Sequence, residues 1–508
     1  MRKFLRFLTQ RVVLTALLIV IQALLLFGII WKLNNYFVYF YAASVLLSLL
    51  LTLRIINNKS NPAFKIAWLI PILLFPVLGG LVYLVFGSDR TGKYIRNKMG
   101  RIEKEMQDGI SKANERSGIE KMPPDVVNQS HYISNSAHCP PYKNTTVEYL
   151  PMGEVKFERM VQELKKAKRY IFMEYFIIQE GTMWNTILDV LEEKAKEGVD
   201  VRVIYDDMGC ILTLPTGYEK TLREKGIQCQ IFNPFIPILS SHFNTRDHRK
   251  ICVIDGNVGF TGGINLADEY INGYEKHGHW KDTAILLKGE AVFSLTTMFL
   301  SMWDYLIKKE GEDYAAYYPD SWDENAQGIV QPFADNPLDD EAVGETVYLN
   351  LINKAKRYVY ITTPYLILSN EMVTAMNTAA KSGVDVRIIT PHVPDKWYVH
   401  AVSRSYYEML VEAGVKIYEY TPGFVHAKTF VVDDEYAVVG TINLDYRSLY
   451  LHFECAAWMY KASCVTDVRD DFLKTQQMSQ EITLEECRNI SIPRRLGRSV
   501  LRVLAPLM

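Results

Sequence analysis

The stretch His248-Arg249-Lys250-Ile251-Cys252-Val253-Ile254-Asp255 decides the fold, and Gly262-Gly263-Ile264-Asn265 follows it closely. A second copy, His426-Ala427-Lys428-Thr429-Phe430-Val431-Val432-Asp433, is followed by Gly440-Thr441-Ile442-Asn443. The run after each lysine is apolar and rich in β-branched residues, which is typical of a buried strand. Residues two apart on a strand point to the same face. The spacing therefore predicts that each histidine and its lysine face one pocket together.

Such a pair of side chains suits phosphoryl transfer. A lysine ammonium supplies a point charge for phosphate oxygens, an asparagine amide is a donor, and a neutral imidazole can attack phosphorus. Two copies give two imidazoles, so one can attack while the other protonates the leaving alkoxide. Asp255 and Asp433 complete the two motifs but lie an odd number of residues from the lysines. On a regular strand they face the other way, which favours a structural role for both.

The two motifs lie in a longer internal repeat. Lys166-Ala167-Lys168-Arg169-Tyr170-Ile171 matches Lys354-Ala355-Lys356-Arg357-Tyr358-Val359, and residues 198–204 match 383–389. Each match joins the end of a helical pattern to the start of a strand. Strands that alternate with amphipathic helices indicate an α/β fold, in which we expect largely parallel pairing. Two halves with one motif strand each predict a pseudo-two-fold domain with the active site at the seam.

Apolar segments at about residues 12–31, 36–53 and 67–86 predict N-terminal transmembrane helices. The third segment contains two prolines and two adjacent glycines, so it either spans the membrane or re-enters it. Basic residues precede the first segment and follow the second and the third. By the positive-inside rule these flanks favour a cytoplasmic catalytic part, and two crossings with a re-entrant third segment satisfy all of them.

The remaining segments differ in charge. We predict a membrane region, a basic linker, a first repeat, an acidic linker, a second repeat and a basic amphipathic tail, at residues 1–88, 89–144, 145–310, 311–340, 341–487 and 488–508. The basic linker suits either anionic headgroups or solvent. The apolar loop at 234–239 either dips into lipid or packs in the core. The tail suits either an anionic membrane surface or docking on its own domain.

Composition restricts the function further. The 508 residues include 56 Lys and Arg against 58 Asp and Glu, and a net charge of -2 does not indicate a nucleic-acid binder. The seven cysteines are scattered without a Cys-x-x-Cys pair, which disfavours a zinc site or a disulfide framework. We expect catalysis without a metal or a cofactor, because two imidazoles and two lysines already provide attack, proton transfer and charge neutralisation.

The double His-x-Lys-x4-Asp pattern resembles the signature of the phospholipase D superfamily. With its apolar N-terminal segments, the chain is most similar to the bacterial cardiolipin synthases, and the resemblance covers nearly all of it. The resemblance implies a two-fold repeated α/β/α sandwich domain, preceded by N-terminal transmembrane helices. It also implies a multi-pass protein of the bacterial plasma membrane with its catalytic domain in the cytoplasm.

The same resemblance implies a role for each site residue. His248 is expected to be the nucleophile that forms a phosphohistidine, and His426 the general acid and then base. Because the two motifs are nearly equivalent, the reverse assignment stays open. Acids downstream of the motifs, Asp282 and Glu454, are expected to orient the histidine rings. Phosphate oxygens are expected to contact the remaining polar residues of the motifs, namely Lys250, Lys428, Asn265 and Asn443.

The implied reaction joins two phosphatidylglycerol molecules into cardiolipin and releases glycerol. The expected partners are then phosphatidylglycerol and anionic membrane lipid. We expect no nucleic-acid partner, and the sequence does not indicate any particular protein partner. A hydrolase, or a transferase that uses another alcohol, fits the same motifs. A nuclease would not need the apolar segments. A membrane scaffold without activity is disfavoured, because both histidines, both lysines and both asparagines are present.

Overall fold

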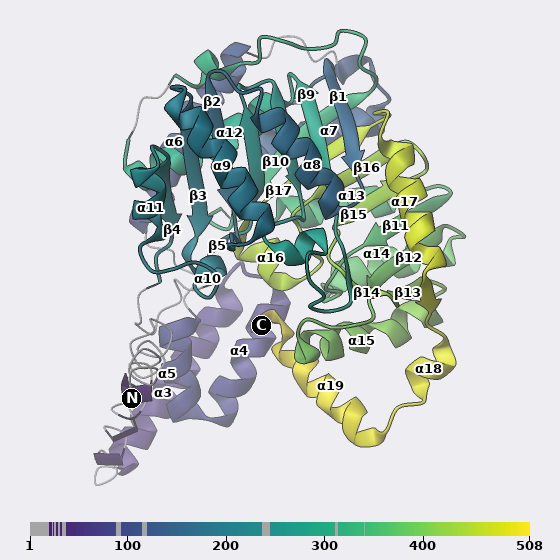
Figure 1. Ribbon diagram of the computed structural model, residues 1–508. Coiled ribbons are helices and arrows are strands. Elements are labelled where there is room, and N and C mark those ends of the chain that lie inside the picture. Colours follow the sequence, from purple (N-terminus) through teal and green to yellow (C-terminus); the bar gives the residue numbers. More distant parts are fainter. Residues whose placement is uncertain are drawn as a thin grey trace.

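The chain folds into two sheet-containing lobes, with the N-terminal helices packed below them (Figure 1). This computed structural model describes residues 37–87, 93–113, 119–235, 244–309, 313–339 and 341–507, together with isolated positions between 20 and 32. Most of the first apolar segment, the tip of the apolar loop at 236–239 and parts of the acidic linker lie outside the described residues.

The first lobe is built on a seven-stranded sheet in the order β1-β9-β7-β6-β2-β3-β4. Its strands are β1 (Thr145–Leu150), β2 (Tyr170–Tyr175), β3 (Asp200–Asp206), β4 (Gln228–Phe232), β6 (Lys250–Ile254), β7 (Val258–Gly262) and β9 (Ala284–Gly289). Its main helices are α8 (Gly153–Leu164), α9 (Thr182–Lys196), α11 (Tyr218–Glu224) and α12 (Val292–Ile307).

Alternating side chains of the strands place these helices on opposite faces of the sheet. Ile171 and Met173 of β2 join the core that α8, α9 and α11 form. Phe172 points the other way and stacks on Phe299 of α12, with ring centroids 4.7 Å apart. Because nearly every residue of β2 is buried, the strand reads as a continuous apolar run, as expected for a sheet covered on both faces.

The second lobe repeats this topology, because its sheet has the order β10-β17-β16-β15-β11-β12-β13 with β18 added at the edge. Its strands are β10 (Ile329–Asp335), β11 (Tyr358–Thr362), β12 (Asp385–Pro391), β13 (Lys416–Tyr420), β15 (Thr429–Val432), β16 (Tyr436–Gly440), β17 (His452–Tyr460) and β18 (Ser479–Glu481). Its helices include α13 (Val343–Lys354), α14 (Asn370–Lys381), α15 (Trp397–Glu412) and α17 (Val465–Gln477). The two-fold repeated α/β domain is therefore present.

Two expectations about the repeat need correction. The pairing is not largely parallel, because in the first sheet only β2, β3 and β4 pair in parallel. Helices α9 and α11 connect these neighbouring strands, whereas β6 and β7 form a hairpin through the turn at Asp255–Asn257, which leaves them antiparallel. The segment predicted as an acidic linker, 311–340, contains β10, the counterpart of β1. The second repeat therefore begins before residue 341, the boundary predicted from the sequence.

Asp255 and Asp433 hold equivalent turns in the two lobes. Asp255 has a φ of 54° and Asp433 a φ of 55°, so both lie in the left-handed region that aspartate tolerates. The Asp255 carboxylate accepts hydrogen bonds from the backbone N–H groups of Lys168, Arg169 and Tyr170, at the start of β2. Asp433 accepts the same three bonds at the start of β11. The last residue of each motif thus joins its strand to the neighbouring one.

The lobes are joined by short strands that cross the seam. β5 (Arg246–Asp247), just before the first motif, pairs in parallel with β17 of the second lobe. β14 (Gly423–Val425), just before the second motif, pairs in parallel with β8 (His279–Lys281) of the first. Each motif therefore enters its own sheet directly after a backbone contact with the other lobe.

The N-terminal helices are α3 (Phe37–Asn57), α4 (Pro62–Leu74) and α5 (Pro76–Phe86). A Cβ on Gly79 would lie 2.2 Å from the Pro71 carbonyl oxygen, so α5 folds back tightly against α4. Residues 67–86 therefore do not form one continuous helix. In the described ranges, no helix combines the length and the apolar character that crossing a membrane requires.

The segment predicted as a basic linker is helical and packs on the lobes. It contains α6 (Lys93–Ala113) and α7 (Pro124–Ala137). Met99, Met106 and Ile110 of α6 are buried in the core that α12 also joins. The C-terminal helices are α18 (Leu484–Arg488) and α19 (Ile492–Leu504).

We expect Asp255→Ala and Asp433→Ala to act on stability rather than on the chemical step. Each change leaves three backbone N–H groups without their acceptor, which is expected to lower the midpoint of thermal unfolding by roughly 2–6 °C. Circular dichroism measures the midpoint, and turnover at low temperature measures the activity of the folded protein. A lost activity with an unchanged midpoint would place these aspartates in the chemistry instead.

Candidate active site

The two motifs meet at the seam, where the backbone of each is fixed by the other lobe. The His248 N–H donates to the Phe453 carbonyl at 2.9 Å, and the His426 N–H donates to the Lys281 carbonyl at 2.6 Å. Both imidazoles are buried, with 7% of each residue exposed. This geometry agrees with the sequence prediction, in which the two histidines and two lysines share one region at the seam.

Each imidazole is held by a carboxylate from the opposite lobe. His248 Nδ1 lies 2.8 Å and 2.9 Å from the two carboxylate oxygens of Glu454, at the beginning of β17. His426 Nδ1 lies 2.7 Å from Asp282 Oδ2, just after β8. A carboxylate beside Nδ1 fixes the tautomer that carries the proton there, which leaves the lone pair on Nε2. Both acids were singled out from the sequence, and the structure adds that they are exchanged between the lobes.

The two carboxylates are supported differently. Glu454 accepts hydrogen bonds from the Ser448 hydroxyl at 2.5 Å and from the Thr441 hydroxyl. Gly263 stands at the position equivalent to Thr441, and a Cβ there would lie 2.1 Å from Asp282 Oδ1. The first copy of the motif thus needs glycine because the Asp282 carboxylate fills the space that a side chain would take. The two copies of the motif therefore differ at this position because their two acids pack differently.

Lys250 and Lys428 are fully buried beside the imidazoles. Each ammonium donates to the carbonyl oxygen of its own motif histidine. Lys428 Nζ also lies 2.9 Å from His426 Nδ1. This arrangement concentrates positive charge where a phosphate dianion or diester would be held.

Burial shifts the pKa of both motif lysines and both motif histidines toward the neutral form. It lowers the pKa of Lys250 to about 8 and that of Lys428 to about 7. Burial and the Lys428 charge together lower the pKa of His426 to about 4, although Asp282 opposes the shift. Burial and the Lys250 charge hold the pKa of His248 well below its usual value. At neutral pH both imidazoles of the free protein are therefore uncharged, as attack through Nε2 requires.

The asparagines of the motifs have local partners. Asn265 accepts from the Ile177 N–H at 3.1 Å and donates to the Tyr270 hydroxyl at 2.7 Å. Its side chain thus links the segment that follows β2 to the 3-10 turn at Asp268–Ile271. The Asn443 side-chain oxygen is buried without a hydrogen-bond partner among the described residues. Direct contact of either amide with a phosphate stays a prediction.

Two aromatic residues that sequence reasoning did not assign complete the site. The Trp280 ring lies 5.6 Å from the His426 ring, and the His452 ring lies 5.6 Å from the His248 ring. Trp280 Nε1 and His452 Nδ1 are buried without a hydrogen-bond partner in the described structure. The sequence spacing could have indicated both residues. Trp280 and His452 each stand two residues before an orienting acid, and residues two apart on a strand share a face.

Three donor atoms here could also surround a cation. Single ligand atoms of His248, His452 and Glu454 lie within 4.8 Å of one another. The fit to a metal ion is poor, because the Glu454 oxygens already accept bonds from His248, Thr441 and Ser448. An ion would have to displace these donors, and metal-independent catalysis stays our prediction.

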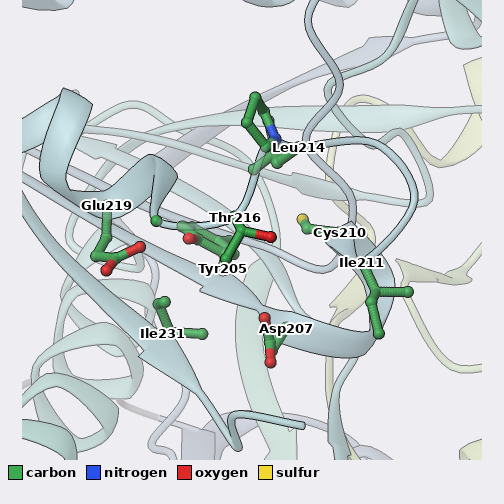
Figure 2. A pocket seen from close by; sticks show the side chains of 10 residues that line it. Tyr205, Asp207, Cys210, Ile211, Leu214, Thr216, Glu219 and Ile231 are labelled. Carbon is green, nitrogen blue, oxygen red and sulfur yellow. The ribbon is translucent and has the colours of Figure 1, made fainter. Parts of the chain in front are cut away.

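A small pocket in the first lobe lies apart from the motifs (Figure 2). Its walls come from the end of β3, from α10 (Asp207–Cys210), from the turn before α11 and from β4. The residues that line it include Tyr205, Asp207, Cys210, Thr216 and Glu219. None of the residues of the two motifs is among them.

Comparison with known proteins agrees with this geometry. A family model described as "Cardiolipin synthase, PLD-like domain" matches residues 160–303 and 348–476, which include both motifs. A second model, described as "Phospholipase_D-nuclease N-terminal", matches residues 46–88. The chain belongs to the phospholipase D-like cardiolipin synthase family. The resemblance seen in the sequence is thereby confirmed.

Individual relatives cover nearly the whole chain. A cardiolipin synthase of Alkalihalophilus pseudofirmus is 36% identical over 455 residues, which are 89% of this chain and 90% of that protein. An uncharacterised protein of Streptococcus mutans is 47% identical over 461 residues, 90% of this chain and 99% of that protein. The phosphatidylserine synthase of Haemophilus influenzae, a solved structure, has a TM-score of 0.59 at 14% identity. It covers 75% of this chain and 100% of its own, and it shows the same fold.

The lowered lysine pKa values predict a bell-shaped pH dependence of kcat/KM for the free enzyme. As pH rises through about 7, Lys428 loses its proton, and Lys250 follows at about 8, so the phosphate loses its positive partners. As pH falls through about 4, His426 becomes protonated. Lys428→Arg keeps its charge, so we expect the basic limb to move from about 7 toward 8.

The measurement is kcat/KM for a short-chain phosphodiester substrate, with each profile scaled to its own maximum. Lys396→Arg is a control for the Lys-to-Arg change itself, because this lysine is exposed and belongs to neither motif. A basic limb that does not move in Lys428→Arg would assign it to another group.

Proposed function

We propose that this chain is a cardiolipin synthase that transfers a phosphatidyl group from one phosphatidylglycerol to another. The observation that carries the proposal is the pair of buried imidazoles, each with Nδ1 against a carboxylate of the opposite lobe. Two buried lysines beside them match the negative charge of a phosphodiester. Family membership supports the same reaction, since relatives from Alkalihalophilus pseudofirmus and Geobacillus are cardiolipin synthases.

In the first half-reaction, His248 Nε2 attacks the phosphorus of phosphatidylglycerol. A P–N bond forms, the P–O bond to glycerol breaks, and the leaving oxygen takes a proton from His426. The bound phosphodiester adds a negative charge near His426, which raises its pKa from the low value of the free protein and allows it to carry that proton. Lys250 and Lys428 stabilise the extra charge on the non-bridging oxygens in the transition state.

In the second half-reaction, the terminal hydroxyl of another phosphatidylglycerol attacks the phosphatidyl-histidine. His426 takes the hydroxyl proton, the new P–O bond forms, and His248 leaves as a neutral imidazole. The sum is two phosphatidylglycerol molecules converted into cardiolipin and glycerol. One phosphodiester replaces another, so the reaction is reversible and needs no nucleotide.

The surroundings of the imidazoles support this division of roles. The largest influences on the His248 pKa, burial and the Lys250 charge, all favour the neutral imidazole that attack requires. For His426, the Asp282 carboxylate raises the pKa against burial, which favours the protonated imidazole that a general acid needs. A nucleophile must be neutral and a general acid must carry a proton, which favours His248 in the first role and His426 in the second.

The N-terminal helices suit a membrane location, and we include it in the proposal. Leu46, Leu49, Leu50 and Leu53 of α3 are more than half exposed, as are Leu74 and Phe75 at the turn between α4 and α5. We propose that these side chains contact lipid, that the α4–α5 turn enters the bilayer without crossing it, and that the lobes are cytoplasmic. Asn58→Cys is then expected to react with a membrane-impermeant maleimide only from the cytoplasmic side. Labelling from outside the cell would reverse this topology.

A substrate with an activated leaving group distinguishes the roles of the two histidines. Phosphatidyl-p-nitrophenol needs no acid at its leaving oxygen, so His426→Ala is expected to release a stoichiometric burst of nitrophenolate and to retain a labelled phosphatidyl group. His248→Ala is expected to show neither the burst nor the label, and to lose at least about 10³-fold in kcat. Stopped-flow absorbance measures the burst, and mass spectrometry under alkaline denaturing conditions locates the label.

The products from labelled phosphatidylglycerol decide between the related activities. Cardiolipin and glycerol from the wild type, and neither from the two alanine variants, establish the transferase. Phosphatidic acid as the main product would indicate a hydrolase. A burst from His248→Ala but not from His426→Ala would exchange the two roles. No turnover by the folded wild type would contradict the proposed function.

A further inference from the structure

The C-terminal helix α19 presents an apolar stripe to the outside of the molecule. Ile492, Leu496, Val500 and Val503 are 83%, 65%, 54% and 38% exposed. They are spaced four, four and three residues apart, so they line up along one side of the helix. A surface helix of a soluble protein normally turns such a stripe inward, so the orientation of α19 is the reverse of the usual one.

The side of α19 that faces the protein carries arginines. The Arg502 guanidinium lies over the Tyr406 ring of α15 at 4.3 Å from its centroid. Arg498 and Leu501 are half-buried on the same side. The helix is also held at both ends, because Arg488 binds Glu412 at 2.8 Å before it and Ala505 is buried directly after it. The outward direction of the stripe is therefore fixed by contacts along the whole helix.

The stripe continues a surface that already exposes apolar side chains. α19 and the turn after it contact α4, and Figure 1 places α19 beside α15 on the same side of the lobes as the N-terminal helices. The charge around the stripe is positive, because Arg494 and Arg495 are exposed and residues 487–508 contain no aspartate or glutamate. Apolar side chains flanked by arginines match the acyl chains and the phosphates of an anionic lipid surface.

We propose that α19 is a fixed lipid-docking helix, which lies in the plane of an anionic phospholipid bilayer with Ile492, Leu496, Val500 and Val503 among the acyl chains. The proposal deepens the proposed function, on which it rests for the presence of a membrane. It assigns α19 to holding the lobes close to the membrane, so that the seam stays near its lipid substrate. A second copy of the chain fits less well, because stripes packed face to face would bring the flanking arginines of both copies together.

An environment-sensitive fluorophore on a single introduced cysteine tests the placement. The seven native cysteines are all buried, so an exposed cysteine can be labelled selectively. Leu496→Cys probes the stripe, and Val155→Cys, on α8 and 37% exposed, is the matched control. The full chain is reconstituted into vesicles of phosphatidylcholine with or without phosphatidylglycerol. Quenching is measured with aqueous iodide and with lipids that carry a nitroxide on the acyl chain.

In vesicles with phosphatidylglycerol, we expect the probe at position 496 to be quenched by the acyl-chain nitroxide and severalfold less by iodide than the probe at position 155. The difference is expected to shrink in pure phosphatidylcholine, because the arginines lose their anionic partners. Equal iodide quenching at both positions would place the stripe in water and overturn the proposal. Protection that depends on protein concentration and not on lipid would assign the stripe to a second copy.

Measurements of turnover distinguish a failure of the lipid-docking proposal from a failure of the proposed function. Leu496→Glu combined with Val500→Glu is expected to leave the rate in mixed detergent micelles unchanged. In vesicles it is expected to lower the rate about tenfold or more, since two apolar side chains no longer enter the lipid. Equal rates of this variant and the wild type in vesicles would overturn the proposal. A protected probe in a protein that makes no cardiolipin would overturn the proposed reaction alone.

Discussion

The site depends on the hydrogen bond between each catalytic imidazole and a carboxylate of the other lobe. His248 is held by Glu454, and His426 is held by Asp282. The backbone also makes contacts between the lobes at these places, because β5 pairs with β17 and β14 pairs with β8 directly before the histidines. Neither lobe alone contains a motif histidine together with the acid that contacts its ring. The reaction therefore requires the two lobes to be joined, and the seam is a structural part of the chemistry.

The duplicated lobes are alike in topology and unlike in the details that a two-step reaction needs. A glutamate supported by two hydroxyl groups stands in one copy, and an aspartate that fills the space beside Gly263 stands in the other. Beside the imidazoles, His452 occupies the place that Trp280 occupies in the other copy. The same burial that lowers the pKa of both lysines keeps water away from a phosphohistidine. In the proposed reaction, these small differences between two equal halves suit one imidazole to attack and the other to transfer protons.

Much of this architecture could be predicted from local patterns. The alternation of side chains on a strand brings His248 together with Lys250, and the repeat predicts a second, equivalent strand. The pairing direction could not be predicted from helix spacing, because the turn at Asp255 makes a hairpin where a crossover was expected. β10 was missed because it lies in an acidic stretch. Which acid meets which histidine depends on contacts about 200 residues apart, such as that of His248 with Glu454, and no local pattern contains it.

Proton NMR of the enzyme with ¹⁵N-labelled histidine tests the exchange of carboxylates most directly. An imidazole Nδ1–H that is held by a buried carboxylate resonates far downfield, and His248→Ala and His426→Ala assign the two signals. The account predicts that Glu454→Gln removes or shifts the His248 signal and leaves that of His426, and that Asp282→Asn does the reverse. Loss of the His426 signal in Glu454→Gln would show that each lobe orients its own histidine, and would contradict the account.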